Sequence, residues 1–429
     1  MTDPLRRAAI VGSARIPFAR SNTAYIDYGN LEMLTAAMSA LVDKFALKHE
    51  LLGEVAAGAV IKHSRDWNLA REATLGAGLD PRTPAYDLQR ACGTSLTITV
   101  QLAQRIALGD IDVAIAAGVD TATDVPVVYH ARLSNIVLAS ARGRTLREKI
   151  APWRALRPVH FKPLVPAVAE PRTGLSMGEH CELMAKDWQI GRAEQDELAL
   201  QSHVKASAAW NERFYQDLVT SFAGLSSDNN VRKDTSREKL ATLRPVFDKS
   251  SAGTLTAGNS TPLTDGAACV LLASEAWAKA RGLSIQAYLT HSAAAAVDYV
   301  AINGPREGLL MAPAHAVPKM LDRAGLSLQD FDIYEIHEAF AAQVLCTLKA
   351  WESADYCRDK LGRTAPLGSI DRAKLNPKGG SIALGHPFGA TGARIVGTLA
   401  KQLAQRGSGR GLISICTAGG MGVTAILER

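Results

Sequence analysis

The chain is organised around KGGSIALGHPFGATGAR, residues 378–394. Five glycines in these 17 residues allow backbone conformations with positive φ and let a substrate approach the main chain closely. Pro387 fixes the bend directly after His386. From Gly389 onward the apolar spacing predicts an amphipathic helix. We therefore expect His386 on a rigid turn at a helix N-terminus. An imidazole displayed in this way needs a nucleophile to act on, which must come from another part of the chain.

The composition is that of an ordinary globular protein. The 429 residues are 47% hydrophobic and 21% charged, enough for two or three domains. The chain lacks an apolar run of about 18 residues, so we expect no transmembrane segment. Its N-terminus resembles neither a signal peptide nor a transit peptide, so we expect a cytoplasmic location. Six cysteines without a CxxC pair predict no disulfide framework. A net charge of +6 suits an anionic ligand and is too dispersed for nucleic acid.

Apolar strand-like segments alternate with helical ones in two sets. The first set has strands at 8–12, 54–61, 83–89 and 112–120 and helices at 30–47 and 68–79; the second covers 287–297, 313–324, 331–340 and 411–428. This alternation predicts an α/β fold with a mainly parallel sheet covered on both faces.

Proline, arginine and tryptophan cluster between the sets. We therefore expect an N-terminal half (1–120 and 251–275), an inserted loop domain (121–250) and a C-terminal half (276–429).

The two sets resemble each other. Cys92 opens a helix containing LAQR that is followed by the strand DVAIAAG, and His386 precedes a helix that also contains LAQR and is followed by GLISICTAGG. This repeat suggests two copies of one α/β unit, with Cys92 and His386 in related positions on facing halves.

Cys92 is the candidate nucleophile. It lies in RACGTS, where a strand gives way to a helix. A helix N-terminus favours the thiolate, and a nearby imidazole is expected to lower the thiol pKa further and to take its proton. The alternative is a buried structural cysteine, the usual fate of an isolated one. The turn context favours the nucleophile.

Cys416 ends an apolar strand and enters the glycine turn of SICTAGGMG. Ligands bind at the ends of such strands. Its alternatives are a small core residue and one member of a redox pair. The cysteines at 181, 269, 346 and 357 lack such turns and are interpreted as structural.

His337 and Glu338 lie in YEIHEAF, where a strand leads into a helix. They are either a polar pair aimed at the same site or a helix start with a favourably placed acid. An HExxH zinc motif is excluded, because the fourth residue after His337 is Ala341.

These residues resemble the thiolase family. RACGTS, HEAF, GGSIALGHPFGATGAR and CTAGGMG match thiolase motifs in order and separation over essentially the whole chain. HEAF, where many thiolases have NEAF, resembles the β subunit of fatty-acid oxidation complexes, as do LVPAVAEPRTGLSMGEH and NSTPLTDGAA. The resemblance implies the thiolase fold, with two similar βαβαβαββ halves in five α-β-α-β-α layers and an inserted loop domain.

The resemblance also implies roles. Cys92 would accept the acyl group, and His386 would take its proton and then help to hold the thioester oxygen. Cys416 would act as acid and base at the α-carbon, helped by a thiol pKa near working pH. His337 would position a water or a donor in a first oxyanion hole, and the backbone N–H groups of Cys92 and Ala418 would form a second.

Coenzyme A and acyl-CoA would be substrates, with no metal and no further cofactor. The residues that match the pantetheine tunnel and substrate contacts of thiolases are Met177, Gly178, Ala257, Gly258, Ser260, Thr261, Ala339 and Phe340. Ser176 stands where some thiolases carry a histidine. A basic run could meet the coenzyme's phosphates, a partner subunit or a membrane surface, or form a solvated loop; it comprises Arg142, Arg144, Arg147, Lys149, Arg154 and Arg157.

The expected reaction is thiolysis of 3-ketoacyl-CoA to acetyl-CoA and a shortened acyl-CoA by a ping-pong mechanism. The alternatives are a biosynthetic acetoacetyl-CoA thiolase and an inactive scaffold subunit. A decarboxylating ketosynthase has no need for a thiol at 416, and a cysteine hydrolase leaves that second cysteine unexplained. The resemblance implies a homodimer or a dimer of dimers, with a hydratase/dehydrogenase α subunit as a further partner.

Overall fold

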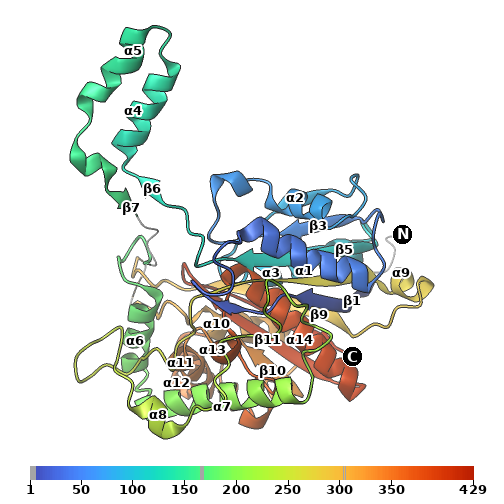
Figure 1. Ribbon diagram of the computed structural model, residues 1–429. Helices are drawn as coiled ribbons and strands as arrows, with labels where there is room; N and C mark the ends of the chain where they lie inside the picture. Colours follow the sequence, from blue (N-terminus) through green and yellow to red (C-terminus); the bar gives the residue numbers. More distant parts are fainter. Residues whose placement is uncertain (1–5, 165–168, 303, 305) are drawn as a thin grey trace.

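The computed structural model describes residues 6–164, 169–302, 304 and 306–429 (Figure 1). Its centre is a mixed sheet of ten strands. The strands of this sheet are β1 (Ala8–Arg15), β2 (Ala19–Arg20), β3 (Glu54–Ala57), β4 (Ala85–Asp87), β5 (Val113–Asp120), β8 (Thr264–Ser274), β9 (Ala287–Ala296), β10 (Ile333–Ile336), β11 (Arg410–Thr417) and β12 (Met421–Glu428).

The two halves of the chain have corresponding strand orders. Outward from the middle, the first half-sheet runs β1-β8-β5-β3-β4 and the second runs β9-β12-β11-β10. Leu375 makes an isolated parallel bridge to Tyr334 of β10, at the position that β4 holds beside β3. Among the described residues, the two half-sheets join through two residue pairs, Ala9 with Tyr288 and Ile10 with Ala287. The domain boundaries at residues 120, 250 and 275 stay predictions.

Helices cover both half-sheets. They are α1 (Asn30–Lys44), α2 (Leu69–Gly76), α3 (Thr94–Leu108) and α9 (Glu275–Ala280) in the first half, and α10 (Ala312–Ala324), α11 (Ala341–Glu352), α12 (Ala354–Asp359), α13 (Ser381–Leu384) and α14 (Thr391–Arg406) in the second; short 3-10 turns occupy Ser64–Asp66, Arg372–Lys374 and Phe388–Ala390.

Alternating strand residues assign these helices to layers. In β5, Ala114 and Ala116 pack toward the middle with residues of α3 and α14, whereas Ile115 packs outward with α1 and α2. In β11, Ile413 faces the same middle layer and Leu412 packs outward with α10 and α11. The order is therefore helix, sheet, helix, sheet, helix, with α3 and α14 enclosed between the two half-sheets (Figure 1).

The prediction of a mainly parallel sheet is wrong. Of the strand pairs in the described part of the chain, β3–β4, β3–β5 and β10–β11 are parallel, whereas β8 runs antiparallel to both β1 and β5, and β12 runs antiparallel to both β9 and β11. The antiparallel pairs come mainly from the last strand of each half: β12 follows β11 directly through the turn 418–420, and β8 enters the sheet after the inserted segment that follows β5. The predicted strand 54–61 also ends early, at Ala57, because the N–H groups of Val60 and Ile61 donate to the Asp120 carboxylate.

The chain leaves the sheet between β5 and β8. Helices α6 (Met177–Asp187), α7 (Arg192–Asn211) and α8 (Arg237–Ala241) lie over the second half, where α6 and α7 contact α11. Residues 128–164 form a separate arm that projects from the body (Figure 1). The arm contains the strand pair β6 (Val128–Tyr129) and β7 (Pro163–Leu164), the helices α4 (Ala131–Arg142) and α5 (Leu146–Ile150), and 3-10 turns at Ala151–Ala155 and Pro158–Phe161. Across the part of the chain that the structure describes, no helix is both long and apolar enough to cross a membrane.

Candidate active site

The two helices of the middle layer bring Cys92 and His386 together. Each residue lies on the turn that precedes its helix, α3 for the cysteine and α14 for the histidine. The first turns of these helices touch: Ala393 N–H donates to Ser95 Oγ at 2.8 Å, and a Cβ on Gly392 would lie 2.3 Å from the Leu96 nitrogen. Only glycine at 392 permits this approach. Residues that are 294 positions apart in the sequence thereby share one site.

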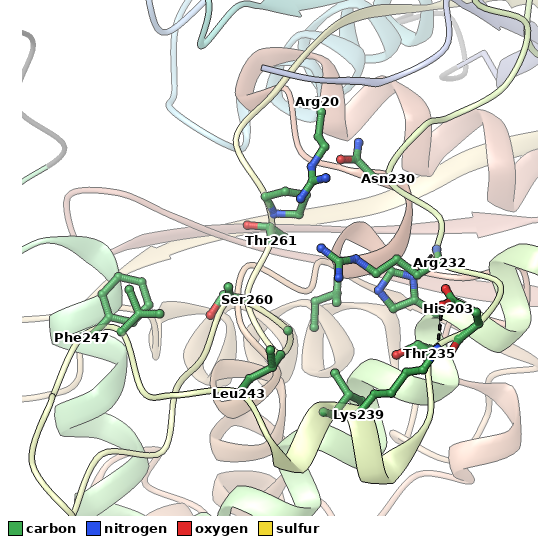
Figure 2. Close-up of a pocket in the computed structure, with 17 residues that line it drawn as sticks. Arg20, His203, Asn230, Arg232, Thr235, Lys239, Leu243, Phe247, Ser260 and Thr261 are labelled. Carbon is green, nitrogen blue, oxygen red and sulfur yellow. Dashed lines mark hydrogen bonds and ion pairs between the residues drawn. The ribbon is translucent and has the colours of Figure 1, made fainter. Parts of the chain in front are cut away.

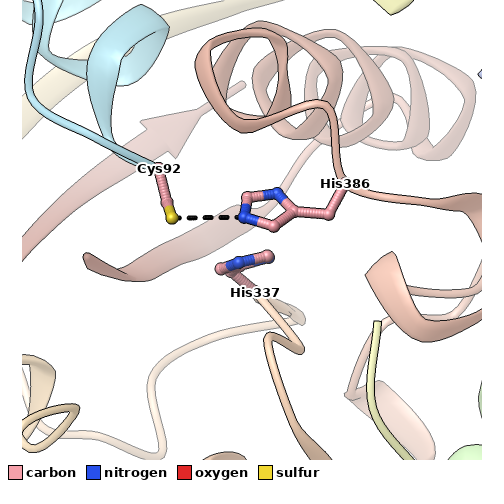
Figure 3. A group of neighbouring side chains, drawn as sticks. All are labelled: Cys92, His337 and His386. Carbon is pink, nitrogen blue, oxygen red and sulfur yellow. Dashed lines mark hydrogen bonds between the residues drawn. The ribbon is translucent and has the colours of Figure 1, made fainter. Parts of the chain in front are cut away.

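Cys92 and His386 are in hydrogen-bond contact (Figure 3). Cys92 Sγ lies 3.2 Å from His386 Nε2, and both side chains are buried. The His386 turn is held at two further points: its backbone N–H donates to Thr264 Oγ1 at 2.7 Å, and its Nδ1 lies 2.6 Å from Thr391 Oγ1. The thiol is therefore presented to a ring nitrogen whose orientation is fixed from the other side.

His337 is the third member of the group. Its ring centroid is 4.1 Å from that of His386, and Figure 3 shows the two rings lying against each other. His337 Nδ1 is 2.8 Å from Ser381 Oγ, which also accepts a hydrogen bond from Arg394 Nη2 at 2.7 Å. His337 Nε2 is buried and has no hydrogen-bond partner among the described residues. It is thus free to bind a group that enters the site.

Burial sets the charge state of these groups. It raises the pKa of Cys92 to about 12, against the opposing effect of the backbone amides of Ala418 and Cys92 itself. Burial, together with the positive charge of Arg394, lowers the pKa of His386 to about 3. Burial and nearby His386 and Arg394 lower the pKa of His337 well below its ordinary value. At neutral pH the pair is therefore a neutral thiol and a neutral imidazole. The prediction that the helix N-terminus and the imidazole would lower the thiol pKa is wrong for the free protein, because loss of hydration outweighs both.

Cys416 lies beside Cys92 at the end of β11. It is buried, and burial and a charge on Cys92 both raise the pKa of Cys416 well above its ordinary value, so the predicted thiol pKa near working pH is wrong for the free protein. The turn that follows has two consecutive left-handed glycines, Gly419 at φ 77° and Gly420 at φ 69°. Gly419 N–H donates to Glu170 of the inserted segment at 2.8 Å. The inserted segment therefore holds this turn directly.

A buried carboxylate ties the His386 turn to the first half, and the motifs did not reveal it. Asp120, at the end of β5, accepts hydrogen bonds from Gly389 N at 2.6 Å and from Ile61 N at 2.7 Å. Burial raises the pKa of Asp120 to about 7. The sequence does contain a signal for it, because Asp120 directly ends the apolar strand DVAIAAGVD. A carboxylate at the end of a buried strand needs hydrogen-bond donors around it.

A cavity of about 350 Å³ lies between Arg20, the segment 257–262 and α8 (Figure 2), and Cys92, His337, His386 and Cys416 do not line it. Its lining includes four of the predicted substrate-binding residues: Ala257, Gly258, Ser260 and Thr261. It also includes residues that no motif indicated: Arg20, His203, Asn230, Arg232, Lys239 and Phe247. Figure 2 shows the guanidinium groups of Arg20 and Arg232 on one side of the cavity, with Asn230 beside them. The cavity therefore suits an anionic ligand.

Comparison with known proteins matches this geometry. Models of the thiolase N-terminal domain and the thiolase C-terminal domain match residues 8–276 and 290–429. The chain belongs to the thiolase family. Among curated thiolases, the 3-ketoacyl-CoA thiolases of Pectobacterium carotovorum and Yersinia pestis are 43% and 41% identical to it, over 98% of this chain and 96% and 97% of theirs.

Solved thiolase structures share the fold. Bacillus anthracis acetyl-CoA acetyltransferase superposes with a TM-score of 0.82 at 30% identity, and human mitochondrial 3-ketoacyl-CoA thiolase with 0.81 at 26% identity, each over 99% of both chains. The family, the fold class and the acyltransferase class predicted from the four motifs are therefore confirmed.

The other predicted tunnel residues of this thiolase lie behind the cavity wall. A Cβ on Gly178 would lie 2.1 Å from the Phe247 ring, and that ring packs edge-on against Phe340 with centroids 5.7 Å apart. The Ala339 carbonyl accepts hydrogen bonds from Thr261 N and Oγ1, both at 3.1 Å. Met177 packs against the core of the second half. Phe247 thus separates Gly178 and Phe340 from the cavity.

Two further motif residues have supporting positions. Glu338 accepts hydrogen bonds from Ser202 Oγ at 2.7 Å, from Asn376 Nδ2 at 2.6 Å and from Ile382 N at 3.2 Å, so its carboxylate anchors the segment 376–382. Ser176 caps α6 by accepting from Glu179 N. The predicted basic run lies on the arm, and none of its members lines the described cavity.

Proposed function

We propose that this thiolase cleaves 3-ketoacyl-CoA with free CoA, giving acetyl-CoA and a shortened acyl-CoA, through an acyl-enzyme on Cys92. The observation that carries the proposal is the 3.2 Å contact between Cys92 Sγ and His386 Nε2, with His337 against the same ring. A buried thiol facing a neutral imidazole is the arrangement that nucleophilic catalysis requires. The printed names of the bacterial relatives support this substrate class.

In the first half-reaction Cys92 attacks the 3-keto carbon. His386 Nε2 takes the thiol proton as the carbon–sulfur bond forms. The bond between the α-carbon and the keto carbon then breaks, its electrons pass to the acetyl-CoA enolate, and the Cys416 thiol protonates the α-carbon. The products of this step are acetyl-CoA and the Cys92 thioester.

In the second half-reaction the Cys416 thiolate takes the proton of free CoA. The CoA sulfur attacks the thioester, Cys92 leaves as a thiolate, and His386 returns its proton. Burial raises the pKa of both thiols, so Cys92 starts with the proton that it passes to His386, and Cys416 starts with the proton that it gives to the α-carbon.

Charge develops on the substrate oxygens in both steps. Once protonated, His386 Nε2 donates to one oxygen together with His337 Nε2. The backbone amides of Ala418 and Cys92, which act on the Cys92 sulfur, would bind the oxygen of the acyl group. The loss of one such donor typically costs ~10²–10³ in rate.

The cavity is the proposed site for CoA. Arg20, Arg232 and Lys239 would meet its phosphates. The Asn230 Oδ1 and Ser260 Oγ atoms are buried, lack partners in the described part of the chain and line the same cavity, so they suit the amide groups of the pantetheine arm. Because every step uses groups of this chain and of its substrates, we propose no further cofactor.

The spacing of Cys92, His337 and His386 would also admit a metal ion, since one ligating atom of each lies within 4.8 Å of the others. A metal would occupy the lone pair of His386 Nε2 that faces the thiol. Proton transfer from Cys92 needs that lone pair, so we assign the three groups to acid–base chemistry rather than to a metal.

The arm is the proposed contact for a partner. Residues 128–164 hold eight lysines and arginines against one glutamate. Their exposed apolar side chains are Val128, Tyr129, Val137, Leu138, Leu146, Ile150, Trp153, Val159, Phe161 and Leu164. Exposed apolar area mixed with positive charge suits an acidic partner surface. We assign it to a hydratase/dehydrogenase α subunit, with a membrane surface as the alternative.

The homodimer or dimer of dimers and the cytoplasmic location stay predictions.

A second function has one observation in its favour. The Bacillus anthracis neighbour is named an acetyl-CoA acetyltransferase, which fits synthesis of acetoacetyl-CoA by the reverse reaction. An inactive scaffold is disfavoured, because Cys92, His337, His386 and Cys416 are all present.

The test is thiolysis by free CoA of 3-ketoacyl-CoA substrates of increasing chain length. The reaction rate is measured as the loss of the enolate absorbance. Activity on medium or long chains supports the proposal, and activity confined to acetoacetyl-CoA supports the biosynthetic alternative. Cys92→Ser should abolish both turnover and the mass increase of the acyl-enzyme. Cys357→Ser, at a buried cysteine of α12, is the matched control and should keep both. Turnover by folded Cys92→Ser at the wild-type rate would refute the proposal.

A further inference from the structure

Each histidine of the site has a hydroxyl group against its Nδ1 atom. Thr391 Oγ1 lies 2.6 Å from His386 Nδ1, and Ser381 Oγ lies 2.8 Å from His337 Nδ1. Both hydroxyl side chains are completely buried. A hydroxyl group has one proton to donate, so its other contacts decide whether the ring nitrogen beside it donates or accepts.

At His386 the hydroxyl group accepts. Thr391 Oγ1 is also 3.2 Å from the Pro387 carbonyl, to which its proton can be donated. The Thr391 oxygen is then free to accept from Nδ1–H, and Nε2 accepts the proton of the Cys92 thiol. The other tautomer would use the Thr391 proton at Nδ1, lose the bond to Pro387 and leave the thiol proton without an acceptor. Only the Nδ1–H tautomer fills all three contacts.

At His337 the hydroxyl group donates. Arg394 Nη2 lies 2.7 Å from Ser381 Oγ, and a guanidinium can only donate. The Ser381 oxygen accepts from Arg394, and its own proton has the His337 Nδ1 lone pair as its acceptor. If Nδ1 instead carried a proton, two donors would face the Ser381 oxygen and its hydroxyl proton would have no acceptor. The His337 proton is therefore on Nε2, the atom that has no hydrogen-bond partner among the residues the structure describes.

We propose that Thr391 and Ser381, the latter oriented by Arg394, are positioning residues that hold the two histidines in opposite tautomers. His386 then presents a lone pair to the Cys92 thiol, and His337 presents an N–H donor to the substrate oxygen. One ring is preset as a base and the other as a donor before substrate arrives. The tautomers follow from the contacts alone, whereas their catalytic consequence rests on the proposed function.

Either reversal would block the chemistry. A proton on Nε2 of His386 would leave the Cys92 proton without a base. A lone pair on Nε2 of His337 would face the negative oxygen of the tetrahedral intermediate and repel it. Because burial and Arg394 keep both rings neutral near pH 7, the position of the one ring proton decides what each histidine does.

The direct test is the ¹⁵N NMR spectrum of the full-length protein labelled at histidine. Imidazole nitrogens with and without a proton have distinct ¹⁵N shifts, and His386→Gln and His337→Gln assign the two rings. We expect protonated Nδ1 for His386 and protonated Nε2 for His337. The opposite pattern in either ring of the wild-type protein would overturn the proposal. This spectrum needs no turnover, so its failure is distinct from a failure of the proposed function.

A variant pair tests the catalytic consequence. Thr391→Ser keeps the hydroxyl group and should keep kcat within about threefold, whereas the isosteric Thr391→Val should lower kcat by ~10²–10³ while KM for CoA stays within about twofold. Ser381→Ala should lower kcat similarly and shift the His337 ¹⁵N signals toward a mixture of tautomers. Thermal unfolding checks that each variant is folded. Equal kcat for the valine and serine variants at 391 would contradict the role of the hydroxyl group.

Discussion

Replacement of Gly389 by alanine should impair catalysis without touching any reacting group. Gly389 lies three residues after His386, where the turn meets the ends of β3 and β5. A Cβ at this position would lie 2.7 Å from the Gly58 carbonyl oxygen and 2.8 Å from that of Val119. These distances fall 0.7 and 0.6 Å short of the 3.4 Å at which ordinary contact begins. Both obstacles are backbone atoms, which cannot rotate away.

The turn therefore has to move outward by about 0.5 Å, and its hydrogen bond to Asp120 lengthens with it. Forced overpacking of this kind costs about 1–3 kcal/mol of stability. A misplacement of about 1 Å can cost ~10² in rate, so a shift of about half that should lower kcat by ~10–100-fold. KM for CoA should change little, because Gly389 does not line the cavity.

The matched control is Gly191→Ala. A Cβ at Gly191 would have no neighbour within 4 Å, and its φ of −71° suits alanine. This glycine precedes α7, so the loss of a favourable N-cap costs about 0.5–1 kcal/mol there, with kcat unchanged. Steady-state thiolysis and thermal unfolding of both variants give the comparison. If Gly389→Ala folds and turns over within twofold of Gly191→Ala, the backbone contacts do not position His386.

Three further outcomes follow from the site. Cys416→Ser should still form the Cys92 acyl-enzyme from a simple acyl-CoA, seen by mass spectrometry, but lose ~10²–10⁴ in carbon–carbon cleavage; full cleavage activity would remove Cys416 from the mechanism. Arg232→Ala should raise KM for CoA about fivefold or more with kcat nearly unchanged, whereas Arg358→Ala, at an exposed residue of α12, should do neither. Burial lowers the pKa of His203 to about 4 from 6.5, so the unfolded chain binds a proton first on acidification and stability falls as pH drops from about 6.5 toward 4. In urea unfolding, the free energy of unfolding of His203→Gln should fall less steeply with decreasing pH than that of the wild-type protein, by about 1.4 kcal/mol per pH unit. An unchanged slope would contradict this prediction.

The sequence allowed Cys92 and His386 to be found because their signals are local. Each lies on a glycine-containing turn that opens a helix, and both turns occur in motifs with a fixed order. The repeat of LAQR after each residue indicated two related units, and the structure has the same strand order in both. Their catalytic roles, like those of His337, Cys416 and Ala418, stay predictions until variants are measured.

Other features depend on distant segments and could not be predicted. Local alternation of strands and helices does not show that β8 returns antiparallel after more than a hundred residues outside the sheet. The thiol pKa was predicted with the wrong sign, because the helix N-terminus is visible in the sequence and the burial that outweighs it is not. Arg20 and Arg232 meet in the cavity from segments without a motif. Thr391 and Ser381 stand inside the decisive stretch, yet no pattern says which hydroxyl group reaches which ring.

The separation of Cys92 and His386 by 294 residues has a consequence for how the protein is made. Synthesis from the N-terminus produces Cys92 first and His386 only 294 residues later. Until α14 packs beside α3, Cys92 Sγ lacks the His386 ring nitrogen that faces it in the folded protein. Under the proposed mechanism, we therefore expect that chains ending before His386 do not react with thioesters.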